Sequence, residues 1–137
     1  MGFPYGRDFV YDEMMLAGPG EKGEAIAKAI VAANAEMGGP GGPQPGEGPS
    51  KQERESGFYD VLFVGLDGDG RQVRVAVRGD RDPGYGSTSK MIAECAICLE
   101  RDLPDLAGGI WTPGAAMGNH LIKRLVDNAG LAFEVEG

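Results

Sequence analysis

Three stretches of the chain carry apolar residues at the three- and four-residue spacing of an amphipathic helix. The first runs from Glu24 to Met37 and ends at two glycines, which favour helix termination. The second runs from Ser87 to about Arg101, and the third from Thr112 to about Asn128. The expected buried stripes of the last two helices are Met91, Ile92, Cys95, Cys98 and Leu99, followed by Met117, Leu121, Leu125 and Val126.

Strand-like patterns occupy the remaining apolar stretches. Residues 58–64 form a run rich in β-formers, and residues 72–78 alternate, with Val73, Val75 and Val77 predicted to point inward. The Asp-Gly pairs of "GLDGDGR" between them predict a β-hairpin, with the first strand covered on both faces and the second half exposed. Residues 131–135 alternate as a final strand.

Local turn and capping chemistry divides the chain into segments. Residues 38–49 are almost entirely glycine and proline, which predicts a linker or mobile loop. Residues 1–37 precede it, with Arg7 to Leu16 as either a strand or a helical turn. Residues 50–137 follow it, and begin with a Ser50/Glu53 capping box. The predicted class is α+β, with an antiparallel or mixed sheet, packed helices and no complete Rossmann domain.

Composition and charge narrow the classes of partner. The 137 residues suit one domain, and their net charge of −8 disfavours nucleic acid and anionic lipid surfaces. We expect no membrane association, because no apolar run approaches the ~20 residues that cross a bilayer. Two cysteines, without a visible signal peptide, fit a reducing cytoplasm.

The stretch "GDRDPGYGSTSKM" is a glycine-rich run that leads into a predicted helix with a lysine, as in many phosphate-binding sites. A P-loop has glycine directly before its lysine, but Ser89 precedes Lys90 here, and the third glycine of a dinucleotide fingerprint is missing. The favoured interpretation is a strand-to-helix turn with Ser87 as the helix cap. The alternative is that free N–H groups at the helix start, with Lys90 nearby, attract an anionic substrate group.

Other motifs favour structure over chemistry. "DGDG" lacks the closing glutamate of a calcium loop, since Arg78 stands in that place. Cys95 and Cys98 lie inside a predicted helix without a second cysteine pair, which favours core packing over a redox or zinc site. His120 is the sole histidine, so multi-histidine metal sites are excluded. We therefore expect no metal, and Trp111 is predicted to staple onto the following helix.

Three ordered blocks resemble the C-terminal part of the saccharopine dehydrogenase-like oxidoreductases, a group that includes trans-acting enoyl reductases. The blocks are "GEGPSKQERESGFYDVLFVG", "VRGDRDPGYGSTSKMIAECAICL" and "LAGGIWTPGAAMGNHLIKRL". The most specific pieces are residues 82–86 leading into Lys90-Met91, and residues 108–113. The resemblance is stronger over residues 46–137 than over residues 7–39.

The resemblance implies an enzyme with an N-terminal Rossmann domain that holds NAD(P), which this chain lacks. The chain is then expected to be the C-terminal substrate-side or oligomerisation domain, without bound cofactor of its own and inactive alone. It is expected to contact the missing Rossmann domain and, as a homodimer, a second copy. The polar residues expected to line a substrate cleft are Tyr85, Lys90, Thr112 and His120. The alternative function is a non-enzymatic dimerisation or interaction module.

Overall fold

The computed structural model describes residues 7–36 and 46–136, which fall into two compact units, Met1–Gly48 and Pro49–Gly137. In the first unit, helix α1 spans Gly20–Glu36, and so begins before the predicted Glu24. The prediction of a strand or helical turn over Arg7 to Leu16 is wrong, because these residues form neither. Met37 and most of the predicted Gly/Pro linker lie outside the described residues.

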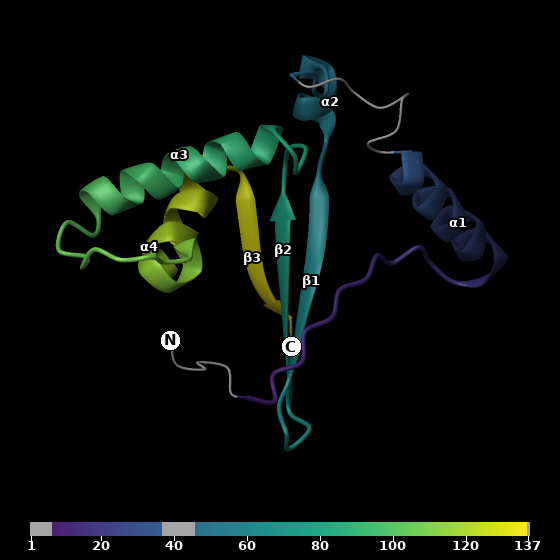
Figure 1. The fold of residues 1–137 in the computed structure, drawn as a ribbon, viewed down its shortest axis with the longest axis horizontal. Coiled ribbons are helices and arrows are strands. Elements are labelled where there is room, and N and C mark those ends of the chain that lie inside the picture. The colour runs from purple at the N-terminus through teal and green to yellow at the C-terminus, as the bar shows by residue number, and fades with distance from the viewer. Residues whose placement is uncertain (1–6, 37–45, 137) are drawn as a thin grey trace. The chain divides into compact units, whose positions relative to one another are not determined.

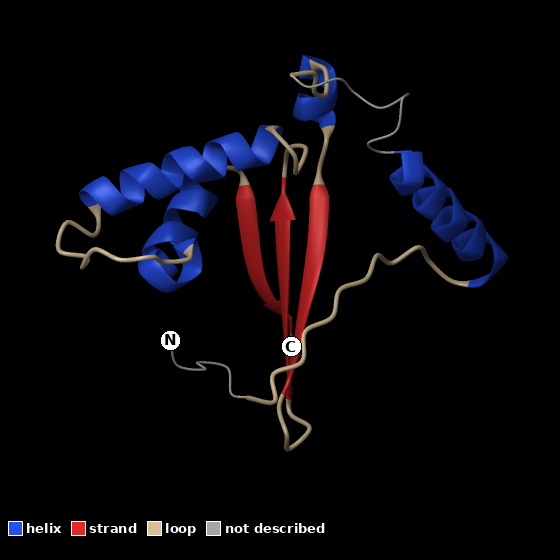
Figure 2. Cartoon of the chain, in the orientation of Figure 1, coloured by secondary structure: helices blue, strands red, loops and turns tan. Residues whose placement is uncertain are grey.

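The second unit combines three helices with one antiparallel sheet (Figure 2). Its elements, in chain order, are α2 (Lys51–Ser56), β1 (Tyr59–Leu66), β2 (Gln72–Gly79), α3 (Gly86–Arg101), α4 (Pro113–Asn128) and β3 (Leu131–Glu136). The strand order is β1-β2-β3, and both neighbouring pairs are antiparallel. This confirms the predicted α+β class, since a Rossmann domain is built on a parallel sheet.

Local chemistry explains where several elements begin. Ser50 and Glu53 form the predicted capping box, with the Glu53 backbone N–H donating to Ser50 Oγ and the Ser50 N–H donating to the Glu53 carboxylate. The hairpin turn is also confirmed: the Asp67 carboxylate accepts from the Asp69 and Arg71 N–H groups, and Gly70 has a φ of 81°. Such a positive φ favours glycine.

The two sides of the sheet differ in chemistry. On one side, which we call the helix-facing side, Val77 lies between Val61 and Phe133 of the neighbouring strands. On the other, the charged side, Arg78 donates to Asp60 at 2.9 Å and to Glu134. Alternating side chains thus separate an apolar surface from an ionic one.

The core forms where α3 and α4 pack against each other and against the helix-facing side of β3. Figure 1 shows α4 next to β3, with α3 passing over the end of the sheet. The buried apolar residues of this cluster are Cys98, Met117, Leu121, Leu125, Ala129 and Leu131. Three predicted stripe residues are exposed, namely Ile92, Leu99 and Val126. Their spacing fits a helix, but they lie on sides of α3 and α4 that the small core does not cover.

Strand β1 is the main departure from the predicted fold. It was expected to be covered on both faces, but in the structure every residue from Asp60 to Leu66 is exposed, including 54% of Phe63. The first half of β2 is exposed too, so the prediction that Val73 points into a core is wrong. Ala76, predicted to face outward, is buried because it lies in the central strand between Leu62 and Glu134.

Tyr59 links the sheet to α3 across a glycine. Its hydroxyl lies 2.8 Å from Oγ of Ser87, which is fully buried. A Cβ at Gly79 would lie 2.2 Å from the Tyr59 ring, so the ring occupies the space that any other residue's side chain would need. Ser87 was predicted to cap α3, but its side chain instead pairs with Tyr59.

We expect Gly79→Ala to destabilise the chain, because the added methyl must displace the Tyr59 ring and leave the Ser87 hydroxyl without a partner. A buried hydroxyl left unpaired costs about 1–3 kcal/mol. Tyr59→Phe removes only the hydroxyl and should show this cost alone, whereas Gly79→Ala should exceed it. Urea denaturation of both variants measures the difference. Equal stability of Gly79→Ala and the wild type would contradict this packing.

Candidate functional site

The turn at residues 82–86, which the sequence marked as a possible anion site, is organised by the Asp82 carboxylate. Asp82 accepts hydrogen bonds from the backbone N–H groups of Gly84 at 2.9 Å, Tyr85 at 3.2 Å and Gly86. These bonds, the one from Gly86 most of all, lower the pKa of Asp82 below its ordinary value. Asp82 therefore caps the start of α3, and the prediction that Ser87 does so is wrong.

Close packing around this turn explains two of its glycines. The Asp82 N–H donates to the Arg54 carbonyl oxygen at 3.2 Å, which joins the turn to the end of α2. A Cβ at Gly86 would lie 2.7 Å from that carbonyl oxygen, and one at Gly57 would lie 2.7 Å from Asp82. The glycines thus allow three chain segments to approach one another at a structural junction.

This arrangement does not suit the pyrophosphate of a dinucleotide. Such a group binds free N–H donors at a helix start, but a carboxylate already occupies these donors and would repel it. Lys90, the nearby cation, has its Nζ 3.9 Å from a carboxylate oxygen of Asp80. The N–H donors of Gly84, Tyr85 and Gly86 are therefore not free for a phosphate group, and the nearby Lys90 is only loosely paired.

The four residues predicted to line a cleft fall on two helices. Tyr85 is the N-cap of α3 and is 59% exposed, and Lys90 follows in the same helix. Thr112 is the N-cap of α4, with no hydrogen bond from its side chain to the helix, and His120 is exposed within α4. In the described part of the chain, no hydrogen bond or ion pair joins any two of them. A shared cleft stays a prediction.

Helix α4 changes direction just before His120. Gly118 has φ 46° and ψ −128°, which is not helical and lies in the region that favours glycine. Met117 and Leu121 on either side of it are nevertheless both buried in the core. The kink therefore keeps the apolar stripe of α4 on the core, while Asn119 and His120 stay exposed.

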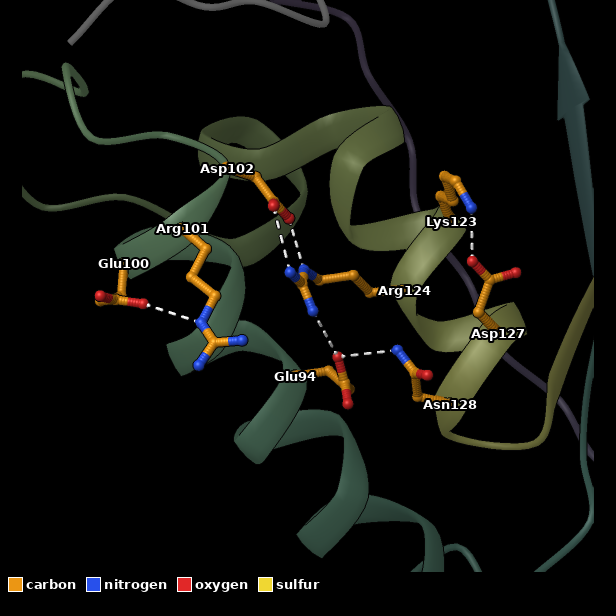
Figure 3. Close-up of polar contacts among 8 residues, drawn as sticks. All are labelled: Glu94, Glu100, Arg101, Asp102, Lys123, Arg124, Asp127 and Asn128. Atoms are coloured by element: carbon orange, nitrogen blue, oxygen red, sulfur yellow. Dashed lines mark hydrogen bonds and ion pairs between the residues drawn. The ribbon is translucent and has the colours of Figure 1, made fainter.

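A partly buried polar network joins α3 and α4 (Figure 3). Arg124 of α4 forms a bidentate pair with Asp102, including an Nη2–Oδ1 bond of 3.1 Å, and a further 3.1 Å bond to Glu94 of α3. Asn128 donates to the same Glu94 oxygen at 3.3 Å. Bidentate arginine–carboxylate pairs fix geometry as well as charge, so this network sets how the two helices align.

This network was not predicted from the sequence. The available signal was the placement of two opposite charges, Glu94 and Arg124, beside the apolar stripes of neighbouring helices. The Arg124 side chain lowers the pKa of Asp102, and the carboxylates in turn raise the pKa of Arg124. Burial raises the pKa of the neighbouring Cys98 thiol, and burial also raises that of Cys95. Both cysteines are free, and both are therefore held as thiols instead of reactive thiolates.

Residues 7–36 and 46–136 contain no group of three or more His, Cys, Asp or Glu side chains placed to hold a metal ion. In the same ranges, every helix is too short or too polar to cross a lipid bilayer.

The side chain of Trp111, predicted to staple onto α4, is half exposed and donates instead to the Ala107 carbonyl at 3.1 Å.

Curated relatives of the chain carry enoyl reductase names. A Mycobacterium tuberculosis protein described as a candidate trans-acting enoyl reductase is 40% identical over 85 residues, which is 61% of this chain and 20% of the relative. Proteins named trans-acting enoyl reductase from Mycobacterium bovis and Mycobacterium ulcerans are 31% and 30% identical over 138 aligned positions, which cover 88% of this chain and 33% of each relative.

These relatives support an enoyl reductase-like family for the chain, which spans a third or less of their length. No protein-family profile matches the chain. No solved structure matches it either.

We expect Asp102 to contribute to stability in a pH-dependent way. Its folded-state pKa is lowered, so its contribution is complete above its ordinary pKa and is lost as the pH falls from about 5 through the folded-state value. Asp102→Asn should therefore be less stable than the wild type at pH 7, and the difference should shrink towards pH 2.5. Thermal unfolding across this range measures it.

The matched control is Glu100→Gln, since Glu100 forms an exposed ion pair with Arg101 at 3.2 Å. Exposed pairs contribute little, so this variant should follow the wild type at every pH. A pH-independent gap between Asp102→Asn and the wild type would contradict the role of the ionised carboxylate.

Proposed function

We propose that this chain is the substrate-side or oligomerisation part of an NAD(P)-dependent enoyl reductase of the saccharopine dehydrogenase-like group, and that it works in the cytoplasm. The observation that carries the proposal is the similarity to trans-acting enoyl reductases over 88% of the chain. The antiparallel sheet supports it, because this architecture is distinct from a nucleotide-binding domain and suits the other part of such an enzyme.

Enoyl reduction adds a hydride to the β-carbon of a C=C bond conjugated to a carbonyl, and a proton to the α-carbon. The reduced cofactor, NAD(P)H, supplies the hydride when it is bound. We place its binding site outside the described residues, since Asp82 occupies the N–H donors of the glycine-rich turn that leads into α3. The task left to this chain is to bind the acyl group and orient its double bond.

Tyr85 and Lys90 are the residues that we assign to the substrate carbonyl. Negative charge develops on this oxygen as the hydride arrives, and a phenol or an ammonium can donate a hydrogen bond to it. Both lie in the first turns of α3, and the Lys90–Asp80 pair is loose at 3.9 Å. Thr112 and His120 of α4 are assigned to more distant parts of the acyl substrate.

An interaction module is the second candidate function. The specific observation in its favour is β1, whose apolar side chains are exposed on both sides of the sheet. Exposed apolar surface of this extent marks contacts with other protein more often than catalysis.

We expect the isolated chain to give no measurable heat of binding with NADPH in isothermal titration calorimetry, at protein concentrations that would detect micromolar affinity. The physical reason is the carboxylate at the turn, which competes with a pyrophosphate for the same donors. Saturable binding of NADPH to the chain alone would contradict the proposal that the cofactor site lies outside the described residues.

A substrate-side role predicts that crotonyl-coenzyme A shifts the backbone NMR signals of residues 85–90, because a bound carbonyl would lie against Tyr85 and Lys90. Tyr85→Phe with Lys90→Met should abolish these shifts. Lys51→Met is the matched control, since Lys51 also forms a 3.9 Å ion pair, with Glu55, at an exposed position. Shifts that are absent, or that survive the double variant, would favour the interaction module instead.

A further inference from the structure

Strand β1 forms an unpaired edge of the described sheet. In an antiparallel ladder, alternate residues bond to one neighbour and the others point their backbone groups away. Two bonds fix this alternation: Asp67 N–H donates to Arg71 at 3.1 Å, and Asp80 N–H donates to Gly130 at 3.2 Å. The odd-numbered residues of β1 therefore pair with β2. The even-numbered ones, Asp60, Leu62, Val64 and Leu66, present their N–H and C=O groups to the open edge.

This edge lacks the devices that usually block strand pairing. Natural edge strands carry lysine, proline or an unpaired inward charge, and β1 contains none of these. Its one charged residue, Asp60, is already paired with Arg78 at 2.9 Å. Its other side chains are apolar on both sides of the sheet, with 54% of Phe63 and 73% of Leu66 exposed.

We propose that two copies of this chain pair through β1, antiparallel about a two-fold axis at Phe63, to form one continuous sheet. In this register Asp60 of each copy pairs with Leu66 of the other, and Leu62 of each copy pairs with Val64 of the other. Every outward-pointing N–H and C=O group of the four even-numbered residues then bonds to the other copy. Registers centred on Leu62 or Val64 leave part of this set unpaired.

Side-chain complementarity favours a second copy as the occupant. Directly opposed residues of an antiparallel pair share a side of the sheet, so Leu62 meets Val64 on the charged side and the two Phe63 rings meet on the helix-facing side. No like charges face each other, because Asp60 is opposed by Leu66. Helix α4 packs on β3, and Val77 of β2 packs on the same core, whereas β1 meets α3 through Tyr59 at its first position and is exposed from Asp60 to Leu66.

The proposal does not depend on enoyl reductase activity, so the two can fail separately. It does place the net charge of −8 on each of two associating copies. Salt screens this repulsion, so the dimer should tighten as ionic strength rises.

The register is tested by cysteine cross-linking. At the two-fold axis, the two residues at position 63 form a non-hydrogen-bonded pair with Cα atoms about 4.5 Å apart, within the range that a disulfide spans. Phe63→Cys should therefore form a covalent dimer under mild oxidation, seen on a non-reducing gel. Val61→Cys is the matched control: it lies on the same side of β1 but opposes Gly65, so it should not cross-link. The wild type, with its two native cysteines, sets the background.

The contact is tested independently by sedimentation velocity on the full chain. We expect a dimer for the wild type. Val64→Lys places an uncompensated charge at the edge, so its dimer dissociation constant should be roughly tenfold higher or more. Ile122→Lys, at an exposed position of α4, should leave the dimer unchanged. A monomeric wild type at high concentration, a dimer insensitive to Val64→Lys, or equal cross-linking at positions 61 and 63 would each overturn the proposal.

Discussion

The packing of α3 against α4 and β3 is the interaction on which the second unit depends. Its apolar part is small, with Cys98, Leu121 and Leu125 at the centre, and it reaches only the half of the sheet nearest β3. The Arg124 network then fixes the alignment of the two helices at the rim of this core. Because α4 lies over β3, at the far edge of the sheet, β1 keeps its apolar residues in contact with solvent.

The glycine-rich turn before α3 illustrates how one carboxylate can change the meaning of a motif. Glycines leading into a helix are typical of phosphate binding, but here Asp82 lies where the phosphate would lie. The same glycines also allow the backbone of α2 to approach within van der Waals distance. The turn therefore has a structural role, because it joins α2 to the start of α3. Any contact of this region with a ligand has to come from side chains such as Tyr85 and Lys90.

Features with local causes could be predicted from the sequence. The Ser50 box, the hairpin at Asp67 and the buried stripe of Met117, Leu121 and Leu125 each depend on residues a few positions apart. Features with non-local causes could not. Strand β1 has the pattern of a covered strand, but it is exposed because α4 packs over β3 at the other edge of the sheet. The capping role of Asp82 likewise depends on how its loop folds back. Of the site, Lys90 could be placed on a helix and Tyr85 in the turn just before it, but their relation to His120 depends on tertiary packing.

The ionic lattice around Arg78 has a consequence for how the sheet can meet other proteins. Stacking a second layer on the charged side would strip water from Asp60, Glu134 and the guanidinium between them, and burial of such groups is costly. That side is therefore reserved for solvent. The sheet can therefore be extended at its edge or covered on its helix-facing side. The ion pairs of its charged side oppose face-to-face stacking of sheets, which is the contact that amyloid fibrils require.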